Sequence, residues 1–147
     1  MSVNKYETTL LPINSDDIWA LREWRNNPLV FEWCRQYRRI DDISQKNWYE
    51  WQSKDPNTEM FIIGQREENK PLMKVGVCGL TDIDYRNARA EFSLYIAPFF
   101  QGQKRSVPAL HKLLDFGFNS LNLNRIWGEV FAGNHALEIF KKVGFSY

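Results

Sequence analysis

Apolar and polar residues alternate, or β-branched residues gather, in five stretches of the chain, and this pattern predicts five strands. The expected strands span residues 7–13, 58–67, 71–83, 88–97 and 125–131. The turn-forming stretches EENKP and DYRNA separate the second, third and fourth strands. These three strands are therefore expected to form an antiparallel meander.

Apolar residues recur at three- and four-residue spacing in four other stretches, which predicts helices over residues 15–27, 44–53, 107–121 and 135–145. Pro28 is expected to end the first helix, and Ser106 to cap the third. Pro108 is tolerated in the first turn of the third helix, and Gly144 is expected to end the fourth. The predicted element order is β-α-α-β-β-β-α-β-α.

The strand expected at 88–97 has two different faces. Phe92, Leu94 and Ile96 share one face, whereas Glu91, Ser93 and Tyr95 share the other. The first face is expected to join the core, and the second to meet something polar.

Composition indicates one soluble domain over residues 1–147. Of the 147 residues, 44% are apolar and 25% are charged, which indicates neither disorder nor a membrane span. The N-terminus shows no secretory signal, so a cytoplasmic location is expected. Two isolated cysteines (Cys34, Cys78) and two scattered histidines (His111, His135) predict neither a disulfide framework nor a metal site.

The formal net charge of +1 argues against nucleic-acid binding through overall charge. A local basic stretch nevertheless lies between Trp19 and Arg39, with three tryptophans and five arginines: Arg22, Arg25, Arg35, Arg38 and Arg39. One interpretation is a solvated helix face, and the other is a surface for a ligand or a partner.

Two stretches resemble the GNAT superfamily of acyl-CoA-dependent N-acetyltransferases. AEFSLYIAPFFQGQKRSVPAL is similar to the family's fourth strand and its pyrophosphate loop, Gln/Arg-x-x-Gly-x-Gly/Ala; ALEIFKKVGF is similar to its Ala-x-x-x-Tyr-x-x-x-Gly-Phe helix ending. LREWRNNP resembles, more weakly, the subgroups that acetylate protein N-termini and a nucleotide-linked amino sugar. The resemblance covers nearly the whole chain and implies an α/β (α+β) fold with a mixed, mostly antiparallel central sheet flanked by helices.

The resemblance also implies acetyl-CoA as co-substrate, with its pyrophosphate at the segment from Gln101 to Val107. Backbone N–H groups at a helix start suit such an anion. Lys104 stands where the family has its central glycine, so a positive φ there would strain the backbone, although Lys104 and Arg105 bring two cations. The expected cofactor-binding residues are Leu94, Tyr95, Ile96, Gln101, Gly102, Gln103, Lys104, Arg105, Ser106, Val107 and Asn134.

For catalysis, the resemblance implies that the backbone around Leu94 to Ile96 donates an N–H to the thioester oxygen. Glu91 is the expected general base, and its alternative interpretation is an ordinary surface carboxylate or an ion-pair partner. The family's tyrosine acid is replaced by Phe140, so Tyr95 is a stand-in with no positional support, as are Ser146 and Tyr147. Gly133 occupies the family's asparagine position, one residue before Asn134, which is expected to cap the helix.

Family members continue beyond the Gly-Phe with two more strands, so the chain is expected to lack these last strands and to cover its open sheet edge as a homodimer. The function expected is acetylation of a primary amine on a peptide N-terminus, an amino sugar or a small molecule. The alternative is a non-catalytic protein that binds acyl-CoA, a partner or nucleic acid, which Lys104, Gly133 and Phe140 favour.

Overall fold

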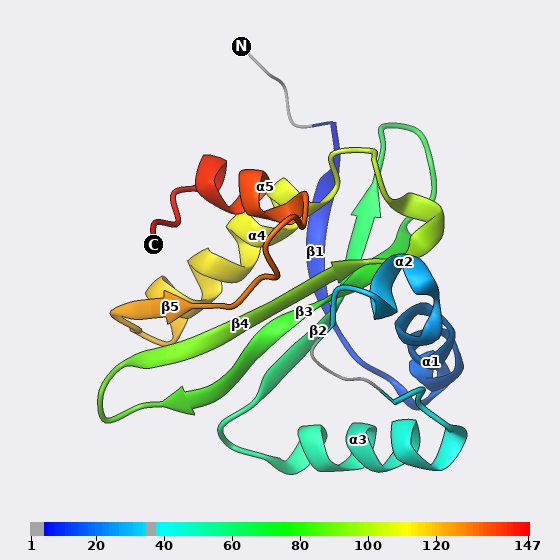
Figure 1. Ribbon diagram of the computed structural model, residues 1–147, viewed down its shortest axis with the longest axis horizontal. Helices are drawn as coiled ribbons and strands as arrows, with labels where there is room; N and C mark the ends of the chain where they lie inside the picture. The colour runs from blue at the N-terminus through cyan, green and yellow to red at the C-terminus, as the bar shows by residue number, and fades with distance from the viewer. Residues whose placement is uncertain (1–4, 35–37) are drawn as a thin grey trace.

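The computed structural model describes residues 5–34 and 38–147 and is built around one five-stranded sheet (Figure 1). The strand order in space follows the sequence order, β1-β2-β3-β4-β5. The first four strands are antiparallel to their neighbours, and β5 runs parallel to β4. The strands are β1 Glu7–Pro12, β2 Glu59–Arg66, β3 Met73–Asp84, β4 Arg89–Ile96 and β5 Arg125–Trp127.

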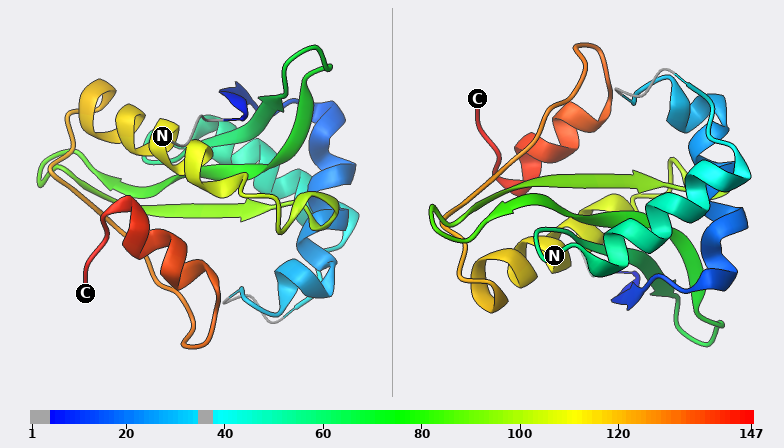
Figure 2. Two further views of the ribbon diagram at one scale, coloured as in Figure 1. Left: turned by 90° about the horizontal axis from the view of Figure 1, so that it is seen from above. Right: turned by 90° about the horizontal axis from the view of Figure 1, so that it is seen from below.

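Helices surround the sheet, and α4 and α5 lie on opposite sides of β4 (Figure 2). The α-helices are α1 Ile18–Asn26, α2 Pro28–Phe31, α3 Asp42–Lys54, α4 Ser106–Asp115 and α5 Ala136–Val143. Short 3₁₀ turns span Ser15–Asp17 and Pro98–Phe100, and a π-helical turn spans Phe116–Ser120. No helix within the described residues is both long enough and apolar enough to cross a membrane.

The predicted fold class is confirmed, and the predicted elements occur in the predicted order, with one additional helix, α2, and with differences at the ends of elements. Pro28 ends α1 as predicted, but it also opens the short helix α2, because proline suits the first helical position. The predicted helix 107–121 is wrong in its second half: α4 ends at Asp115 and passes into the π-helical turn. The predicted strand 125–131 is shorter, since β5 ends at Trp127.

The two faces of the sheet bury different clusters. The larger cluster packs α4 against β2, β3, β4 and β5 through Leu80, Leu110, Leu113 and other buried residues, and Leu94 and Ile96 pack against it. The smaller cluster packs Leu21 of α1 against the opposite face, where Tyr95 also lies. Consecutive β4 residues therefore face different helices, as the alternation predicted, but the face expected to meet something polar packs Tyr95 against an apolar cluster.

Candidate functional site

The central feature of the site is the point where β4 and β5 separate. Their parallel pairing covers only Arg89, Ala90 and Glu91 of β4, and its last pair joins Glu91 to Trp127. From Phe92 to Ile96, β4 keeps its antiparallel partner β3 on one side, whereas β5 no longer pairs with the other side. The backbone around Leu94 to Ile96 thus has an open edge, which an extended ligand can use as a strand would.

The turn after β4 leads directly from this edge to the start of α4. It contains two residues with positive φ, Gly102 at 75° and Lys104 at 60°. A Cβ added at Gly102 would meet nothing within 4 Å, so the turn is open around that residue. The side-chain amide of Gln101 donates to the carbonyl oxygens of Ile96 at 3.0 Å and Leu29 at 3.3 Å, which joins the turn to β4 and α2.

Lys104 has the left-handed backbone conformation that the glycine of the family motif would adopt without strain. A non-glycine residue there costs on the order of 1 kcal/mol. Its side chain is exposed, and among the described residues no carboxylate forms an ion pair with it. The ammonium group is therefore available to an anionic ligand at the turn.

Arg105 differs from its expected role, because its side chain is turned inward. It is only 8% exposed, and its guanidinium carbon lies 4.3 Å from the ring centre of Tyr6 and 4.9 Å from that of Phe100. Its Nε donates to Gln103 Oε1 at 2.9 Å, and one terminal nitrogen donates to Gln65 Oε1 at 3.3 Å. Aromatic faces, amide oxygens and the Glu67 carboxylate, 3.6 Å from a terminal nitrogen, satisfy this cation inside the protein, so Arg105 is not the expected second surface cation at the turn.

Two residues that the sequence analysis missed hold the turn from beneath. Gln65, fully buried in β2, donates to the carbonyl oxygen of Arg105 at 2.8 Å and to Thr8 Oγ1 at 3.2 Å. The Tyr6 hydroxyl donates to the carbonyl oxygen of Gln103 at 2.8 Å. The available signal was a glutamine that follows directly on the apolar stretch FIIG, since a buried amide needs hydrogen-bond partners.

The start of α4 offers free donors, although its cap differs from the prediction. Arg105 is the N-cap residue and Ser106 is already helical, so Ser106 does not cap α4. No side chain bonds to the first-turn N–H groups from this N-cap position. The N–H groups of Ser106 and Val107 therefore combine with the positive end of the helix dipole to favour an anion, while Pro108 has no N–H to leave unsatisfied.

Replacing Lys104 separates its charge from its backbone strain. We expect Lys104→Gly to be more stable than Lys104→Ala by about 1 kcal/mol, because only alanine retains a strained positive φ. Both variants lose the same cation, so both should bind CoA about 2- to 10-fold more weakly than the parent protein. Urea unfolding and calorimetry measure the two effects, and an alanine variant as stable as the glycine variant would contradict the observed backbone conformation.

Glu91 lies at the last paired position before the strands separate, opposite Thr81 of β3 and Trp127 of β5. It is 6% exposed and is held by contacts within the fold, so it is not an ordinary surface carboxylate. Leu94 lies three residues further along the strand, about 10 Å away at 3.3 Å per residue. The length of a glutamate side chain and one bridging water together span such a distance.

Tyr95 packs against the smaller cluster and faces Arg25 of α1, whose guanidinium carbon lies 5.9 Å from the ring centre. Burial raises the pKa of the Tyr95 phenol, and this effect outweighs the opposing effect of Arg25. Tyr95 is therefore neutral at physiological pH. Because its acidity is weakened, it suits hydrogen bonding to a ligand better than proton donation to a thiolate.

The helix ending leaves two further residues in supporting roles. Phe140 packs edge-on against Phe92 with ring centres 5.1 Å apart, so its ring contributes to the core cluster. The Asn134 side-chain oxygen accepts from the Ala136 N–H at 2.9 Å, so Asn134 contacts the start of α5, although His135 and not Asn134 is the N-cap residue. Gly144 ends α5 with a φ of 122°, as expected.

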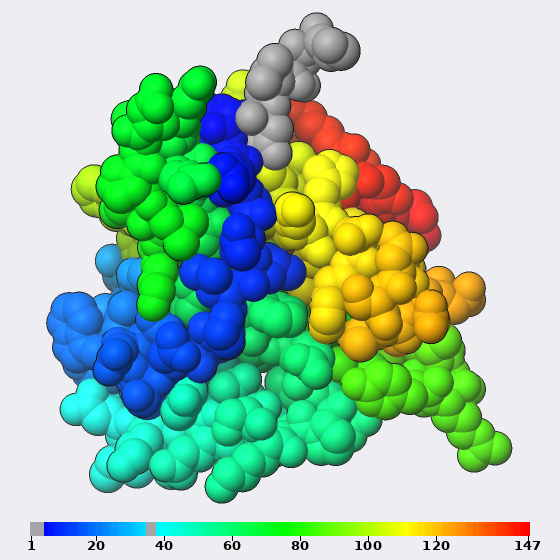
Figure 3. All heavy atoms as spheres, turned by 180° about the vertical axis from the view of Figure 1, so that it is seen from behind, coloured from blue at the N-terminus to red at the C-terminus, as the bar shows by residue number. Residues whose placement is uncertain are grey.

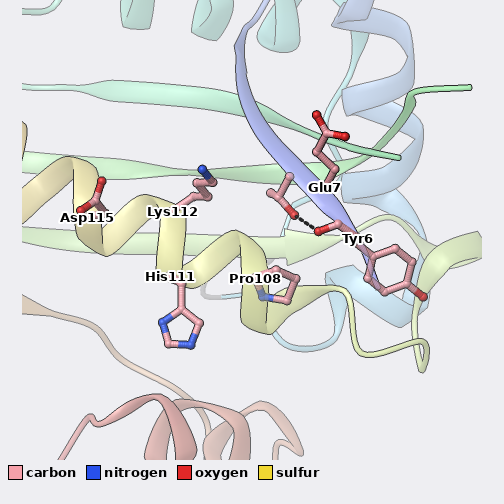
Figure 4. Close-up of a pocket in the computed structure, with 7 residues that line it drawn as sticks. Tyr6, Glu7, Pro108, His111, Lys112 and Asp115 are labelled. Atoms are coloured by element: carbon pink, nitrogen blue, oxygen red, sulfur yellow. Dashed lines mark hydrogen bonds between the residues drawn. The ribbon is translucent and has the colours of Figure 1, made fainter. Parts of the chain in front are cut away.

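A separate hollow of about 420 Å³ lies between β1 and α4, on the face shown in Figure 3. It contains none of the expected site residues; its lining comprises Tyr6, Glu7, Thr8, Pro108, His111, Lys112 and Asp115. Figure 4 shows that the Tyr6 ring points toward the turn before α4, where its hydroxyl bonds to Gln103. Tyr6 therefore both lines this hollow and supports the turn before α4.

Comparison with known proteins identifies the same fold and family. An acetyltransferase (GNAT) domain model matches residues 7–146. Spermidine N(1)-acetyltransferase of Escherichia coli K12 is 26% identical over 142 residues, which cover 96% of this chain and 74% of that protein. The crystal structure of spermidine N-acetyltransferase from Vibrio cholerae in complex with CoA and spermine is 24% identical, has a TM-score of 0.85, and is matched over 95% of this chain and 80% of that one.

A second structure of the Vibrio cholerae enzyme, described as dodecameric and in an intermediate state, is 24% identical with a TM-score of 0.76 and covers 95% of this chain and 79% of that one. These structural likenesses establish the fold, and the domain match establishes the family. The chain therefore belongs to the GNAT family, and the enzyme class expected from the sequence, an acyl-CoA N-acetyltransferase with acetyl-CoA as co-substrate, is confirmed.

Proposed function

We propose that this chain transfers the acetyl group of acetyl-CoA to a primary amine by direct attack within a ternary complex. The observation that carries this proposal is the continuity of the open β4 edge, the turn at Gly102 and Lys104, and the free N–H groups at the start of α4. Together these groups suit an extended amide-containing arm that ends in a pyrophosphate. The acceptors proposed are a peptide N-terminus, an amino sugar or a small amine.

In this proposal the pantetheine arm pairs with β4 at Leu94 to Ile96, and an N–H there faces the thioester oxygen. The pyrophosphate contacts backbone N–H groups between Gln101 and Val107, together with the Lys104 ammonium. Arg105 contributes its backbone only, because its side chain is bound to Gln65 and Gln103. Asn134 supports the helix start and has no assigned contact with CoA.

The reaction needs one proton acceptor on the protein. Glu91, directly or through a water, takes the proton that makes the amine nucleophilic. The amine nitrogen then forms its bond to the thioester carbon, and the negative charge that develops on oxygen is stabilised by the β4 N–H. The C–S bond breaks as the nitrogen loses its second proton, and a water passes that proton to the CoA thiolate, so no acid is required where Phe140 stands or from Tyr95.

Two measurements test the proposed function. CoA at a hundredfold excess over its dissociation constant should stabilise the protein by about 2.7 kcal/mol, which a thermal-shift experiment detects. Acetyl-CoA with a panel of amines should release free thiol, and mass spectrometry should find the acetylated amine. A thermal shift without thiol release would favour the non-catalytic alternative, which the Phe140 ring in place of a tyrosine supports.

The oligomeric state stays a prediction. The homodimer was expected from an open sheet edge, and the dodecamer belongs to the Vibrio cholerae enzyme. The location in the cytoplasm likewise stays a prediction.

A further inference from the structure

The end of α1 places one arginine, Arg25, beside β4. Arg25 lies in the last turn of α1 and is half-buried, and its guanidinium faces the Tyr95 ring. One of its terminal nitrogens donates to Cys34 Sγ at 2.7 Å. No carboxylate within the described part of the chain lies within ion-pair distance of it. Arg25 therefore has several unused N–H donors.

The other arginines of the basic stretch that the structure describes are engaged elsewhere. Arg22 forms ion pairs with Glu23 at 2.9 Å and with Asp42 at 2.8 Å. Arg39 donates to the carbonyl oxygen of Asn26 at 2.8 Å and lies over the Phe31 ring. Arg38 is exposed and has a contact within the fold, and Arg35 lies outside the described residues.

Both groups that face Arg25 are neutral near pH 7. Burial raises the pKa of the Cys34 thiol, outweighing the effect of Arg25, and the Sγ atom lies 3.1 Å from the carbonyl oxygen of Val30, to which it donates. The Tyr95 phenol is neutral for the same reason. The positive charge of Arg25 is thus half-buried and uncompensated, which costs free energy unless a ligand supplies the opposite charge.

This position belongs to the acceptor side of the proposed site. Tyr95 and Glu91 share the β4 face that Arg25 approaches, whereas the pyrophosphate turn lies beyond the end of β4. Figure 1 shows α1 and α2 beside the second half of β4. An anion at Arg25 would therefore lie about one side-chain length from the backbone of Tyr95, near the reacting amine.

We propose that the acceptor amine carries an oxyanion, either a carboxylate or a phosphate, and that this oxyanion binds the guanidinium of Arg25. This inference rests on the proposed function. An acceptor of this class differs from spermidine, a polycation that this uncompensated arginine would repel. A planar guanidinium binds two oxygens of either oxyanion at once, so Arg25→Lys retains the charge and loses this geometry.

Matched acceptor pairs test the proposal. Thiol release is measured with O-phosphoethanolamine against ethanolamine, glucosamine 6-phosphate against glucosamine, and 4-aminobutyrate against its amide, with spermidine as the cationic arm. The anionic member of at least one pair should have a kcat/KM about 10- to 100-fold above its neutral counterpart. The phosphate and carboxylate pairs distinguish the two oxyanions. Equal values within every pair, or spermidine as the best acceptor, would overturn the proposal.

Arg25→Met should remove this preference and leave the thermal shift with CoA intact, whereas the preference should survive Arg22→Met, on the same helix. A weakened CoA shift in Arg25→Met would assign the arginine to the cofactor and overturn the proposal. If no amine is acetylated, the proposed function fails. Calorimetry of each anionic acceptor with the CoA-saturated protein then still tests whether Arg25 binds an oxyanion. Binding that depends on Arg25 supports the oxyanion site, and no binding, or binding independent of Arg25, rejects it.

Discussion

Glu91→Gln is expected to lower kcat by about 100- to 10,000-fold, the range that a positioned general base contributes. Glutamine has nearly the same shape as glutamate and cannot accept the amine proton. Because Glu91 lies on β4 before the open edge and away from the turn, the thermal shift with CoA should be unchanged. Thiol release under saturating acetyl-CoA and acceptor measures the effect.

The matched control is Glu59→Gln, which changes a partly exposed carboxylate on β2 that has no place in the proposed chemistry. This variant should retain parental turnover. A rate in Glu91→Gln within a factor of about three of the parent protein would exclude Glu91 as the base. A lost thermal shift would instead show that Glu91 supports the cofactor-binding structure.

Arg105→Met is expected to destabilise the protein by about 2–4 kcal/mol, since it removes a buried cation from two aromatic faces, two amide oxygens and the Glu67 carboxylate. Methionine retains an apolar stem but leaves Gln65 Oε1 without its donor. For a chain of this size the midpoint of thermal unfolding should fall by roughly 5–15 °C. CoA binding should also weaken, because the turn would lose its support.

Arg66→Met provides the comparison for that variant. Arg66 is also on the β2 side of the fold, but its side chain is half exposed and forms a surface ion pair with Glu7 at 2.8 Å. Its loss should cost less than about 1 kcal/mol. Similar destabilisation by the two variants would show that the buried cluster contributes no more than a surface contact.

Sequence periodicity predicted the strands and most of the helices, because their apolar spacing directly reflects which face is buried. It also predicted the contrasting faces of β4, whereas the turn at Gln101 to Val107 was implied by the resemblance to the family's pyrophosphate loop. Lys104 illustrates a sound conditional prediction: the motif marked a position suited to glycine, and the structure has a positive φ there.

Periodicity could not predict contacts between residues distant in sequence. Arg105 was expected to face a ligand because it stands beside Lys104 in the segment that resembles the pyrophosphate loop, yet Tyr6 and Gln65 provide an interior site for it. The end of α4 was missed because the apolar spacing continues to Leu121, while the backbone widens into a π-helical turn where Gly117 packs against Ile126. Arg25 was one of several equivalent arginines until the structure showed which ones were paired.

The support beneath the turn also bears on the order of folding. The Tyr6 contact with Gln103 spans 97 residues, and the Gln65 contacts with Arg105 span 40. Contacts of such high sequence separation form late, because the intervening chain must first be closed into a loop. The turn before α4 is therefore supported only after the first strand has docked. We accordingly expect the ability to bind CoA to appear late in folding.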